Sequence, residues 1–534
     1  MQQNGTSSIM FEKLSAQMNQ PRRFLSSDFA LLGALAVVKL LLHFFTNGHY
    51  GYFSDELYYI AAGEHLDWGF AEFPPLVAVI ANISRWLLGD SLFAIRLFPA
   101  IAGALTVFLT GIIVRELGGG RFAQCLAAIA VILAPGYLFL QTVLTMNAFE
   151  PLLWMICAYI AILILKYEAP KLWLLAGLVI GIGLMNKFSI AFFAVSLLIS
   201  FSITPARKLL FNRWLLLGCV IAIVICLPTV LWQSQHGWAF LEHQRESNLY
   251  EKKPFLQSTL DLFLQQIILI NPTALPIWLA GLYYYLFTRD GRKYRAFGWT
   301  YIVILGLFLF FEARYYYLFP IYPLFLGAGA IVFEQLFKHG KYLKSAFLSF
   351  LIAGGVILAP IGLPILPIEM AIGYSNFVYR PPTLAKDIKN QSEQAPWHFR
   401  LMLGWEETVA TVAAVYDRMT PSEQSECAIL AWRYGDAGAI DFWGRNYNLP
   451  KAISGHTGYY FWGPKEYSGE LVLSVGGNLS FLKQRFDSVE QVATVTHEES
   501  VGIKSNLPIY QCRGIKKPLN ELWSDFKFYF KRPT

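Results

Sequence analysis

The sequence predicts an all-α polytopic membrane domain followed by a small soluble α/β domain. Of 534 residues, 55% are hydrophobic and only 15% are charged, which is less charge than a soluble protein of this size carries. Apolar runs recur down to Pro367, and a helix needs about 20 such residues to cross a bilayer core. After that point, shorter apolar segments alternate with charged and turn residues. These observations define the two domains.

About eleven apolar runs within residues 29–366 are predicted to be transmembrane helices. They cover residues 29–46, 91–114, 122–140, 147–165, 171–186, 189–204, 214–232, 262–288, 297–311, 316–337 and 345–366. Residues 74–88 are apolar but short, so we interpret them as an amphipathic helix at the membrane interface. Residues 1–28 precede the first run.

Lys and Arg residues mark one side of the membrane. They cluster in loops between alternate runs: Arg115 and Arg121; Lys166 and Lys171; Arg207, Lys208 and Arg213; Arg289, Arg292, Lys293 and Arg295; Lys338, Lys341 and Lys344. Short basic loops stay in the cytoplasm, and residues 1–28 belong with them. This places outer loops 47–90 and 233–261, and the domain 367–534, on the outer face.

The net charge of +7 is accounted for by these loops. No basic stripe remains for nucleic acid, so membrane lipids are predicted partners and nucleic acid is not.

The segment 367–534 is predicted to be an α/β domain. Residues 405–419 follow the 3.6-residue period of an amphipathic helix. Residues 427–432, 471–475 and 508–512 are typical of strands. Outside the cytoplasm, Cys427 and Cys512 could form a disulfide, although spacing does not decide this.

The first outer loop is the most informative segment. Residues 47–73 hold five acids and no Lys or Arg. Asp55 and Glu56 are adjacent carboxylates set among aromatic residues, which suits a catalytic base at a bilayer surface. Alternatively, Ser54 caps a helix and the two acids favour its positive end.

Other polar residues are predicted at the same membrane face. Charged groups at membrane depth are costly and are therefore functional candidates; here they are Arg96, Glu150, Lys187 and Arg314, with the neutral Asn147 near Glu150. Arg and Lys could bind a lipid phosphate, and a nearby carboxylate could accept a proton. Alternatively, Lys187 snorkels to the interface and Arg314 pairs with Glu312.

Several further residues have two interpretations. Tyr315 and Tyr316 could contact a lipid carrier or form an aromatic belt. Candidate substrate-channel residues are Tyr59, Glu72, Asn147, Gln233 and His236. Lys39 and His43 share one face of the first helix, where internal packing is favoured over chemistry.

The motifs resemble those of a known superfamily. They are Asp55-Glu56, Pro74-Pro75-Leu76, Arg96-Leu-Phe-Pro99, Asn186-Lys187 before Ser189, Trp232-Gln-Ser-Gln-His-Gly-Trp238, and Tyr315-Tyr-Tyr-Leu-Phe-Pro-Ile-Tyr-Pro323. In order and predicted topology they are similar to the bacterial branch of the protein O-mannosyltransferase and aminoarabinose (lipid A) transferase superfamily. These are integral-membrane glycosyltransferases of the GT-C fold, and the resemblance covers about residues 28–366.

The resemblance implies a role for each site residue. Asp55 would be the base that deprotonates the acceptor, supported by Glu56. Glu150, beside Asn147, occupies the position of a second acid, where relatives more commonly have Asp. Lys187 and Arg314, assisted by Arg96, would neutralise the departing polyprenyl phosphate, with Tyr315 and Tyr316 beside the carrier.

The resemblance also implies an inverting single displacement. One sugar would move from a polyprenyl-phosphate donor to a protein, lipid A or other glycan acceptor. This would occur on the periplasmic face of a bacterial cytoplasmic membrane. Members differ over a divalent metal, and this sequence offers no trusted ligand set, so metal dependence stays open.

Two alternatives belong to other functional classes. A transporter or flippase of lipid-linked sugar would need ionisable residues deep in the spans and commonly an internal repeat. Lys39 and His43 are the deep pair seen, and no repeat is evident. A receptor or scaffold would use the domain 367–534, but eleven spans exceed what anchoring needs.

Overall fold

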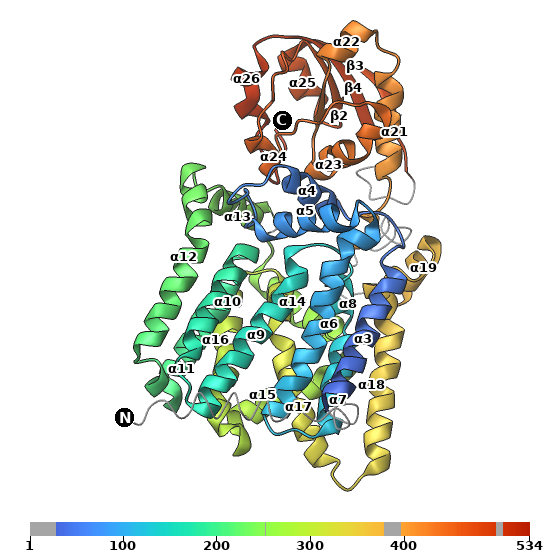
Figure 1. The fold of residues 1–534 in the computed structure, drawn as a ribbon. Coiled ribbons are helices and arrows are strands. Elements are labelled where there is room, and N and C mark those ends of the chain that lie inside the picture. The colour runs from blue at the N-terminus through green and yellow to red at the C-terminus, as the bar shows by residue number, and fades with distance from the viewer. Residues whose placement is uncertain (1–27, 251, 379–396, 498–505, 534) are drawn as a thin grey trace.

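The computed structural model describes residues 28–250, 252–378, 397–497 and 506–533. A helical bundle forms one end of the molecule, and a domain containing a sheet forms the other (Figure 1). A layer of short helices lies between them.

Within the described residues, six helices are long and apolar enough to cross a membrane, or seven if one bent pair counts as a span. The six are α3 (Asp28–Thr46), α6 (Leu92–Glu116), α9 (Met146–Tyr167), α12 (Arg213–Gln235), the segment Tyr315–Leu336 containing η4 (Tyr315–Ile321) and α17 (Tyr322–Leu336), and α18 (Lys341–Gly362). The chain is therefore a multi-pass membrane protein, and the count of eleven spans stays a prediction.

Shorter helices complete the bundle. They are α7 (Arg121–Ile132), α8 (Pro135–Leu140), α10 (Leu172–Asn186), α11 (Ile190–Ser202), η1 (Pro205–Leu209), α14 (Phe255–Leu269), η2 (Pro272–Ala274), α15 (Leu275–Phe287), η3 (Asp290–Tyr294), α16 (Arg295–Phe310) and α19 (Ile368–Val378). Each predicted span corresponds to between one and three of the observed helices.

Two predicted spans are broken, so their prediction as single helices is wrong. Residues 262–288 fall on α14 and α15, which meet at a bend of 91°. Asn271 has φ of +77° there, and Pro272 cannot donate a helical hydrogen bond. Residues 122–140 are divided between α7 and α8, and Pro135 starts the second helix.

Small residues bring neighbouring helices into close contact. A Cβ atom on Gly177 of α10 would lie 2.0 Å from the backbone oxygen of Gly218 of α12. A Cβ atom on Gly329 of α17 would lie 1.7 Å from the backbone oxygen of Ile277 of α15. Such backbone approach is how membrane helices gain packing energy, since lipid is as apolar as their side chains.

The layer above the bundle contains α4 (Ser54–Glu64), α5 (Leu76–Leu88) and α13 (Ala239–Tyr250) (Figure 1). Helix α5 is amphipathic in its burial: Val77 and Ala81 are fully buried, whereas Trp86 is 81% exposed and Leu87 is 55% exposed. Exposed aromatic and aliphatic side chains suit the membrane interface, and the interfacial position of residues 74–88 stays a prediction.

The C-terminal domain contains a four-stranded sheet in the order β1-β2-β4-β3. Strand β1 (Ala428–Ala431) is parallel to β2 (Leu471–Val475), and β4 (Leu507–Ile515) is antiparallel to both β2 and β3 (Phe486–Val495). Strands β1, β2 and β4 were predicted. Strand β3 was missed because many of its residues are exposed, which leaves it without a clear apolar pattern. Cys427 and Cys512 are free and buried, so they form no disulfide.

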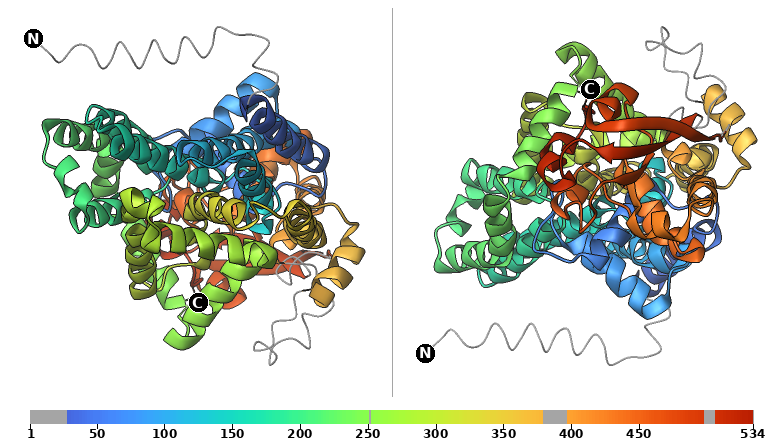
Figure 2. Two further views of the ribbon diagram at one scale, coloured as in Figure 1. Left: turned by 90° about the horizontal axis from the view of Figure 1, so that it is seen from below. Right: turned by 90° about the horizontal axis from the view of Figure 1, so that it is seen from above.

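Helices surround this sheet, and the domain lies over one end of the bundle (Figure 2). They are α20 (Trp397–Arg400), α21 (Trp405–Tyr416), α22 (Pro421–Glu426), α23 (Tyr434–Trp443), η6 (Gly444–Tyr447), α24 (Gly458–Phe461), α25 (Leu479–Arg485), α26 (Leu519–Leu522) and η7 (Trp523–Phe526). Helix α21 matches the amphipathic helix predicted for residues 405–419.

Helix α4 and helix α23 share one apolar core. Leu57 and Ile60 of α4 are buried in the same cluster as Ala437 and Ile440 of α23. A Cβ atom on Gly438 would lie 2.9 Å from the backbone of Leu57. The helix that carries Asp55 is therefore packed directly against the C-terminal domain.

Candidate active site

The acidic segment begins helix α4. Phe53 is the N-cap residue, and its N–H donates a hydrogen bond of 2.8 Å to Oε2 of Glu56. Ser54 is the first helical residue, and its hydroxyl donates to Oδ1 of Asp55 at 3.2 Å. Ser54 therefore does not cap the helix, and Glu56 satisfies the N-terminal amide in its place.

Glu56 and Arg96 form a salt bridge between side chains that are both 0% exposed. Arg96 donates from Nε to Oε1 of Glu56 at 2.9 Å and from Nη2 to Oε2 at 2.8 Å. It also donates to the carbonyl oxygens of Asn47 and Gly51, each at 2.8 Å. Glu56 Oε1 accepts the N–H of Leu144 at 2.9 Å. Through these contacts both side chains hold the loop in place.

Asp55 lies where α4 meets the C-terminal domain. Its Oδ1 accepts a hydrogen bond of 2.8 Å from the hydroxyl of Tyr434, the first residue of α23. Burial raises the pKa of Asp55, while the hydrogen bonds from Tyr434 and Ser54 and the positive charge of Arg314 lower it. A carboxylate with a raised pKa is a better proton acceptor, as a general base requires.

Two cations flank Tyr316. Arg314 donates from Nη1 to the Tyr316 hydroxyl at 3.2 Å and from Nη2 to the Ser247 hydroxyl at 3.1 Å. The Nζ atom of Lys187 lies 5.2 Å from the ring centre of Tyr316 and 4.0 Å from that of Tyr317. The positive charge of Arg314 also lowers the pKa of Asp55, so the two groups interact electrostatically.

Lys187 occupies the turn between α10 and α11, against the start of α9. Its Nζ donates to Oε2 of Glu150 and to Oδ1 of Asn147, each at 2.8 Å. The Ser189 hydroxyl donates to the other Glu150 oxygen. The side chains of Lys187 and Glu150 are only 9% and 3% exposed. Glu150 is thus the counter-ion of Lys187.

Glu72 is a second acid near Asp55. Burial raises its pKa to about 8, and the charge of Asp55 adds to the shift. The Tyr58 hydroxyl donates to Oε2 of Glu72 at 3.1 Å and accepts the N–H of Gly458 at 2.8 Å. Tyr59 is also buried. Its burial raises the pKa of the Tyr59 hydroxyl most, and the charge of Asp55 raises it further.

Two further predicted residues, Tyr315 and Gln233, form hydrogen bonds between separate segments of the chain. The Tyr315 carbonyl accepts from Gln266 at 2.6 Å, which ties η4 to α14. Gln233 is buried, donates to the Phe70 carbonyl at 2.8 Å and accepts the N–H of Phe240 at 2.9 Å. Gln233 therefore fastens the two outer loops to each other.

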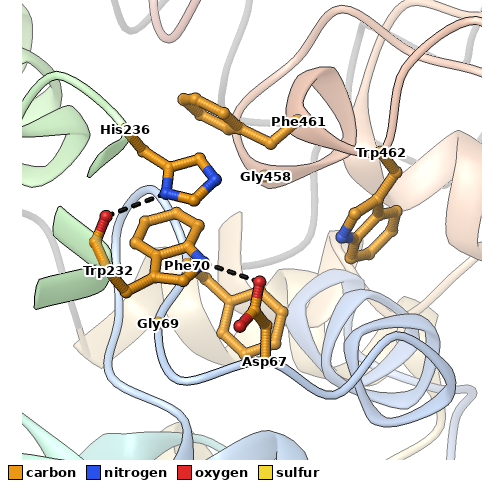
Figure 3. A pocket seen from close by; sticks show the side chains of 8 residues that line it. All are labelled: Asp67, Gly69, Phe70, Trp232, His236, Gly458, Phe461 and Trp462. Carbon is orange, nitrogen blue, oxygen red and sulfur yellow. Dashed lines mark hydrogen bonds between the residues drawn. The ribbon is translucent and has the colours of Figure 1, made fainter. Parts of the chain in front are cut away.

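His236 lines a cavity of about 40 Å³ (Figure 3). Its ring stacks on Trp232 with centroids 3.9 Å apart, and Trp232 Nε1 donates to Asp67 Oδ2 at 2.7 Å. A volume of this size holds about one water molecule, which is too little for a sugar ring.

A larger cavity of about 470 Å³ lies between the first outer loop and α10. Its lining is mainly apolar and consists of Leu66, Asp67, Trp68, Pro75, Leu76, Val79, Ile182 and Met185. Its size falls in the range of ligand-binding pockets.

The sequence interpretation did not identify Tyr434, Tyr317 or Ser247 as site residues. Tyr434 lies 379 positions from Asp55, and no local pattern connects the two. Tyr317 belongs to a run with two interpretations, an aromatic belt or a carrier contact, and only Tyr315 and Tyr316 were named for the latter. Among the described residues, no three His, Cys, Asp or Glu side chains cluster to hold a metal ion.

Comparisons with known proteins agree with this fold. Residues 72–232 match the family described as dolichyl-phosphate-mannose-protein mannosyltransferase. A lipid A galacturonosyltransferase, RgtD, of Rhizobium johnstonii is 23% identical over 261 residues, which are 46% of this chain and 52% of that protein. The chain thus aligns with about half the length of that relative.

Two solved structures resemble the whole fold. ArnT from Cupriavidus metallidurans in the apo state matches with a TM-score of 0.53 and 14% identity, over 90% of this chain and 97% of ArnT. ArnT bound to undecaprenyl phosphate matches with a TM-score of 0.56 and 13% identity, over the same shares. At such identities the likeness concerns the fold.

The fold is that of a GT-C type membrane protein. It is similar to the protein O-mannosyltransferase and aminoarabinose-transferase superfamily, which confirms the resemblance drawn from its motifs.

Proposed function

We propose that the protein is a glycosyltransferase that moves one sugar from a polyprenyl-phosphate donor to an acceptor on the periplasmic face of a bacterial cytoplasmic membrane. The observation that carries this proposal is the buried carboxylate of Asp55, held by the Tyr434 hydroxyl and acted on by the positive charge of Arg314. Tyr316 then links Arg314 to Lys187. A base and two phosphate-binding cations are the groups that such a transfer needs.

The chemistry would be a single displacement. Asp55 accepts the proton of an acceptor hydroxyl or amine while that oxygen or nitrogen bonds to the anomeric carbon. The bond from the anomeric carbon to the phosphate oxygen breaks, and its electron pair stays on the phosphate. Arg314 and Lys187 stabilise the resulting charge. The attack from the opposite side inverts the anomeric centre.

The large apolar cavity supports a lipid-linked donor. Its volume of about 470 Å³ and its Leu, Val, Ile and Met lining suit several isoprene units of a carrier chain. Apolar surface of this kind is stabilised when lipid covers it. Trp68, 60% exposed at its wall, suits the interface between headgroups and acyl chains.

The acceptor is a protein, a lipid or an envelope glycan. The names of the lipid A galacturonosyltransferase and the mannosyltransferase family favour a lipid A sugar or a protein hydroxyl. The periplasmic orientation is supported by the basic loops. Helix α7, whose first residue is Arg121, lies at the end of the bundle away from α4 and the C-terminal domain (Figure 1).

A flippase is the weaker alternative. The deep ionisable pair has neutral contacts: Lys39 Nζ lies 3.5 Å from the Tyr137 carbonyl oxygen, and His43 Nδ1 lies 3.3 Å from the Thr142 hydroxyl. Both side chains are fully buried. These contacts favour internal packing over ion or substrate transport.

The test uses lipid-linked sugars that accumulate when the gene is deleted. The accumulated lipid-linked sugar is isolated with a radiolabel in its sugar. It is then added to liposomes that contain the purified protein, together with a membrane extract as the source of acceptor. We expect the label to leave the carrier and appear on an acceptor. Movement of the intact lipid between leaflets, with its sugar–phosphate bond preserved, would overturn the assignment in favour of a flippase.

A further inference from the structure

We propose that the C-terminal domain is a working part of the transferase site, and that its Tyr434 is the positioning residue for Asp55. This inference rests on the proposed function, since it concerns the base of that reaction. The Tyr434 hydroxyl donates a hydrogen bond of 2.8 Å to Asp55 Oδ1 across 379 positions of sequence.

The position of Tyr434 is itself fixed. Its N–H donates to Nδ1 of His456 at 3.1 Å, and its ring stacks on the His456 ring with centroids 5.0 Å apart and planes at 5°. On α4, the Tyr58 ring stacks on the Tyr434 ring at 4.8 Å. Tyr434 therefore lies between a histidine of its own domain and the helix that carries Asp55.

His456 supplies neutral support. Its Nδ1 accepts from Tyr434, so the proton is on Nε2, which donates to the Tyr529 carbonyl at 2.7 Å. Burial lowers the pKa of His456 to about 3. The imidazole is therefore uncharged at neutral pH, and the support does not change with ordinary pH variation.

A tyrosine suits this task chemically. Burial is the larger and the charge of Asp55 the smaller of two effects that raise the pKa of Tyr434 well above its ordinary value. The phenol consequently stays protonated and acts as a donor to the carboxylate. The hydrogen bond from Tyr434 fixes one oxygen of the Asp55 carboxylate. The second oxygen is thereby oriented to accept the proton of the acceptor.

A second contact ties the domain to the acids of the loop. The Gly458 N–H donates to the Tyr58 hydroxyl, and that hydroxyl donates to Glu72. A Cβ atom on Gly458 would lie 2.1 Å from this hydroxyl oxygen, so the fit requires glycine. Both Asp55 and Glu72 are thus connected to the domain.

The charged and titratable groups around Asp55 come from several elements. They are Glu56 and Tyr59 on α4, Glu72 in the following loop, Arg314 before η4, and Tyr434 on α23. Of these, Tyr434 donates a hydrogen bond to the ionised form of Asp55. Its loss would raise the pKa of Asp55.

The experiment uses full-length Tyr434→Phe, because α4 and α23 share a core and truncation would expose it. Phe retains the stacked ring and removes the hydroxyl. We expect kcat to fall by roughly 10- to 100-fold, with the acidic limb of the rate–pH profile moving up by about one unit. KM for the lipid donor should stay unchanged. Tyr416→Phe is the matched control, since its hydroxyl donates to the Gln424 carbonyl in the same domain.

A spectroscopic measurement separates this inference from the proposed function. The infrared carbonyl band of protonated Asp55, isolated by subtracting the Asp55→Asn spectrum, should appear at higher pH in Tyr434→Phe. If Tyr434→Phe does not fold, 3-fluorotyrosine at position 434, a stronger donor, should move the band to lower pH. If the Asp55 band shifts but the wild type transfers no sugar, the interaction between Tyr434 and Asp55 is supported and the proposed function is contradicted. An unshifted band would overturn the inference.

Discussion

Arg96 of α6 and Glu56 of α4 are joined by two hydrogen bonds, of 2.9 and 2.8 Å, while both side chains are fully buried. The same guanidinium binds two carbonyl oxygens of the first outer loop. The pair thus determines how Asp55, the neighbour of Glu56, is presented. These contacts are structural, and the part in the chemistry that the family resemblance implied for both residues stays a prediction.

Glu56→Gln is expected to destabilise the protein. It leaves the Arg96 charge buried without its ion partner, which costs roughly 3–5 kcal/mol. Glu64→Gln is the control on the same helix: its salt bridges with Arg85 and Lys451 are more exposed, and such pairs are worth about 0–1 kcal/mol. Denaturation in detergent measures both. Normal stability of Glu56→Gln together with lost transfer would instead place Glu56 in the reaction.

Lys187→Met is expected to impair both folding and phosphate binding. It leaves Glu150, whose side chain is 3% exposed, as an unpaired buried charge that costs roughly 3–5 kcal/mol. Adding Glu150→Gln removes that charge and should restore most of the stability.

The affinity of the double variant for undecaprenyl phosphate should remain at least about tenfold below that of the wild type. The reason is that the charge-assisted hydrogen bond from Lys187 to the phosphate is absent. Thermal denaturation and lipid-binding measurements on both variants test this. Recovery of full lipid affinity in the double variant would show that Lys187 serves to neutralise Glu150.

Glu72 should make stability depend on pH. An unfolded chain ionises this residue near 4.5, whereas the folded protein keeps it protonated until about 8. Between these values the folded state holds the extra proton, so stability falls as pH rises.

Glu72→Gln should flatten this dependence, because Gln resembles the protonated acid. Melting temperatures in detergent between about pH 5 and 8 provide the measurement. Glu470→Gln, at an exposed position, is the control and should follow the wild type. Parallel curves for wild type and Glu72→Gln would contradict the assignment.

Local sequence patterns predicted much of the fold. Apolar length and period located the helices and three strands, because burial in lipid or in a sheet leaves a regular apolar pattern. The break at Asn271 was missed although Asn271-Pro272 is a turn signal, because the apolar residues on either side were interpreted as one run. Strand β3 was missed because its exposure removes the pattern that marks a strand.

Candidate site residues could be selected from the sequence where single residues are costly or unusual. Lys187 and Arg314 were selected because charge at membrane depth is expensive, and Asp55 because it adjoins a second carboxylate in an acidic loop. Their partners could not be predicted. Glu150 lies 37 positions from Lys187 and Tyr434 lies 379 from Asp55, and such pairs are formed by tertiary packing.

Asp55→Asn tests the central claim most directly. Asn keeps the size of the side chain and an oxygen for Tyr434, but it cannot accept the acceptor's proton. Sugar transfer from the polyprenyl-phosphate donor should fall by roughly 100- to 10,000-fold, with melting temperature and lipid affinity unchanged and Glu64→Gln fully active. Undiminished transfer by folded Asp55→Asn would contradict the account.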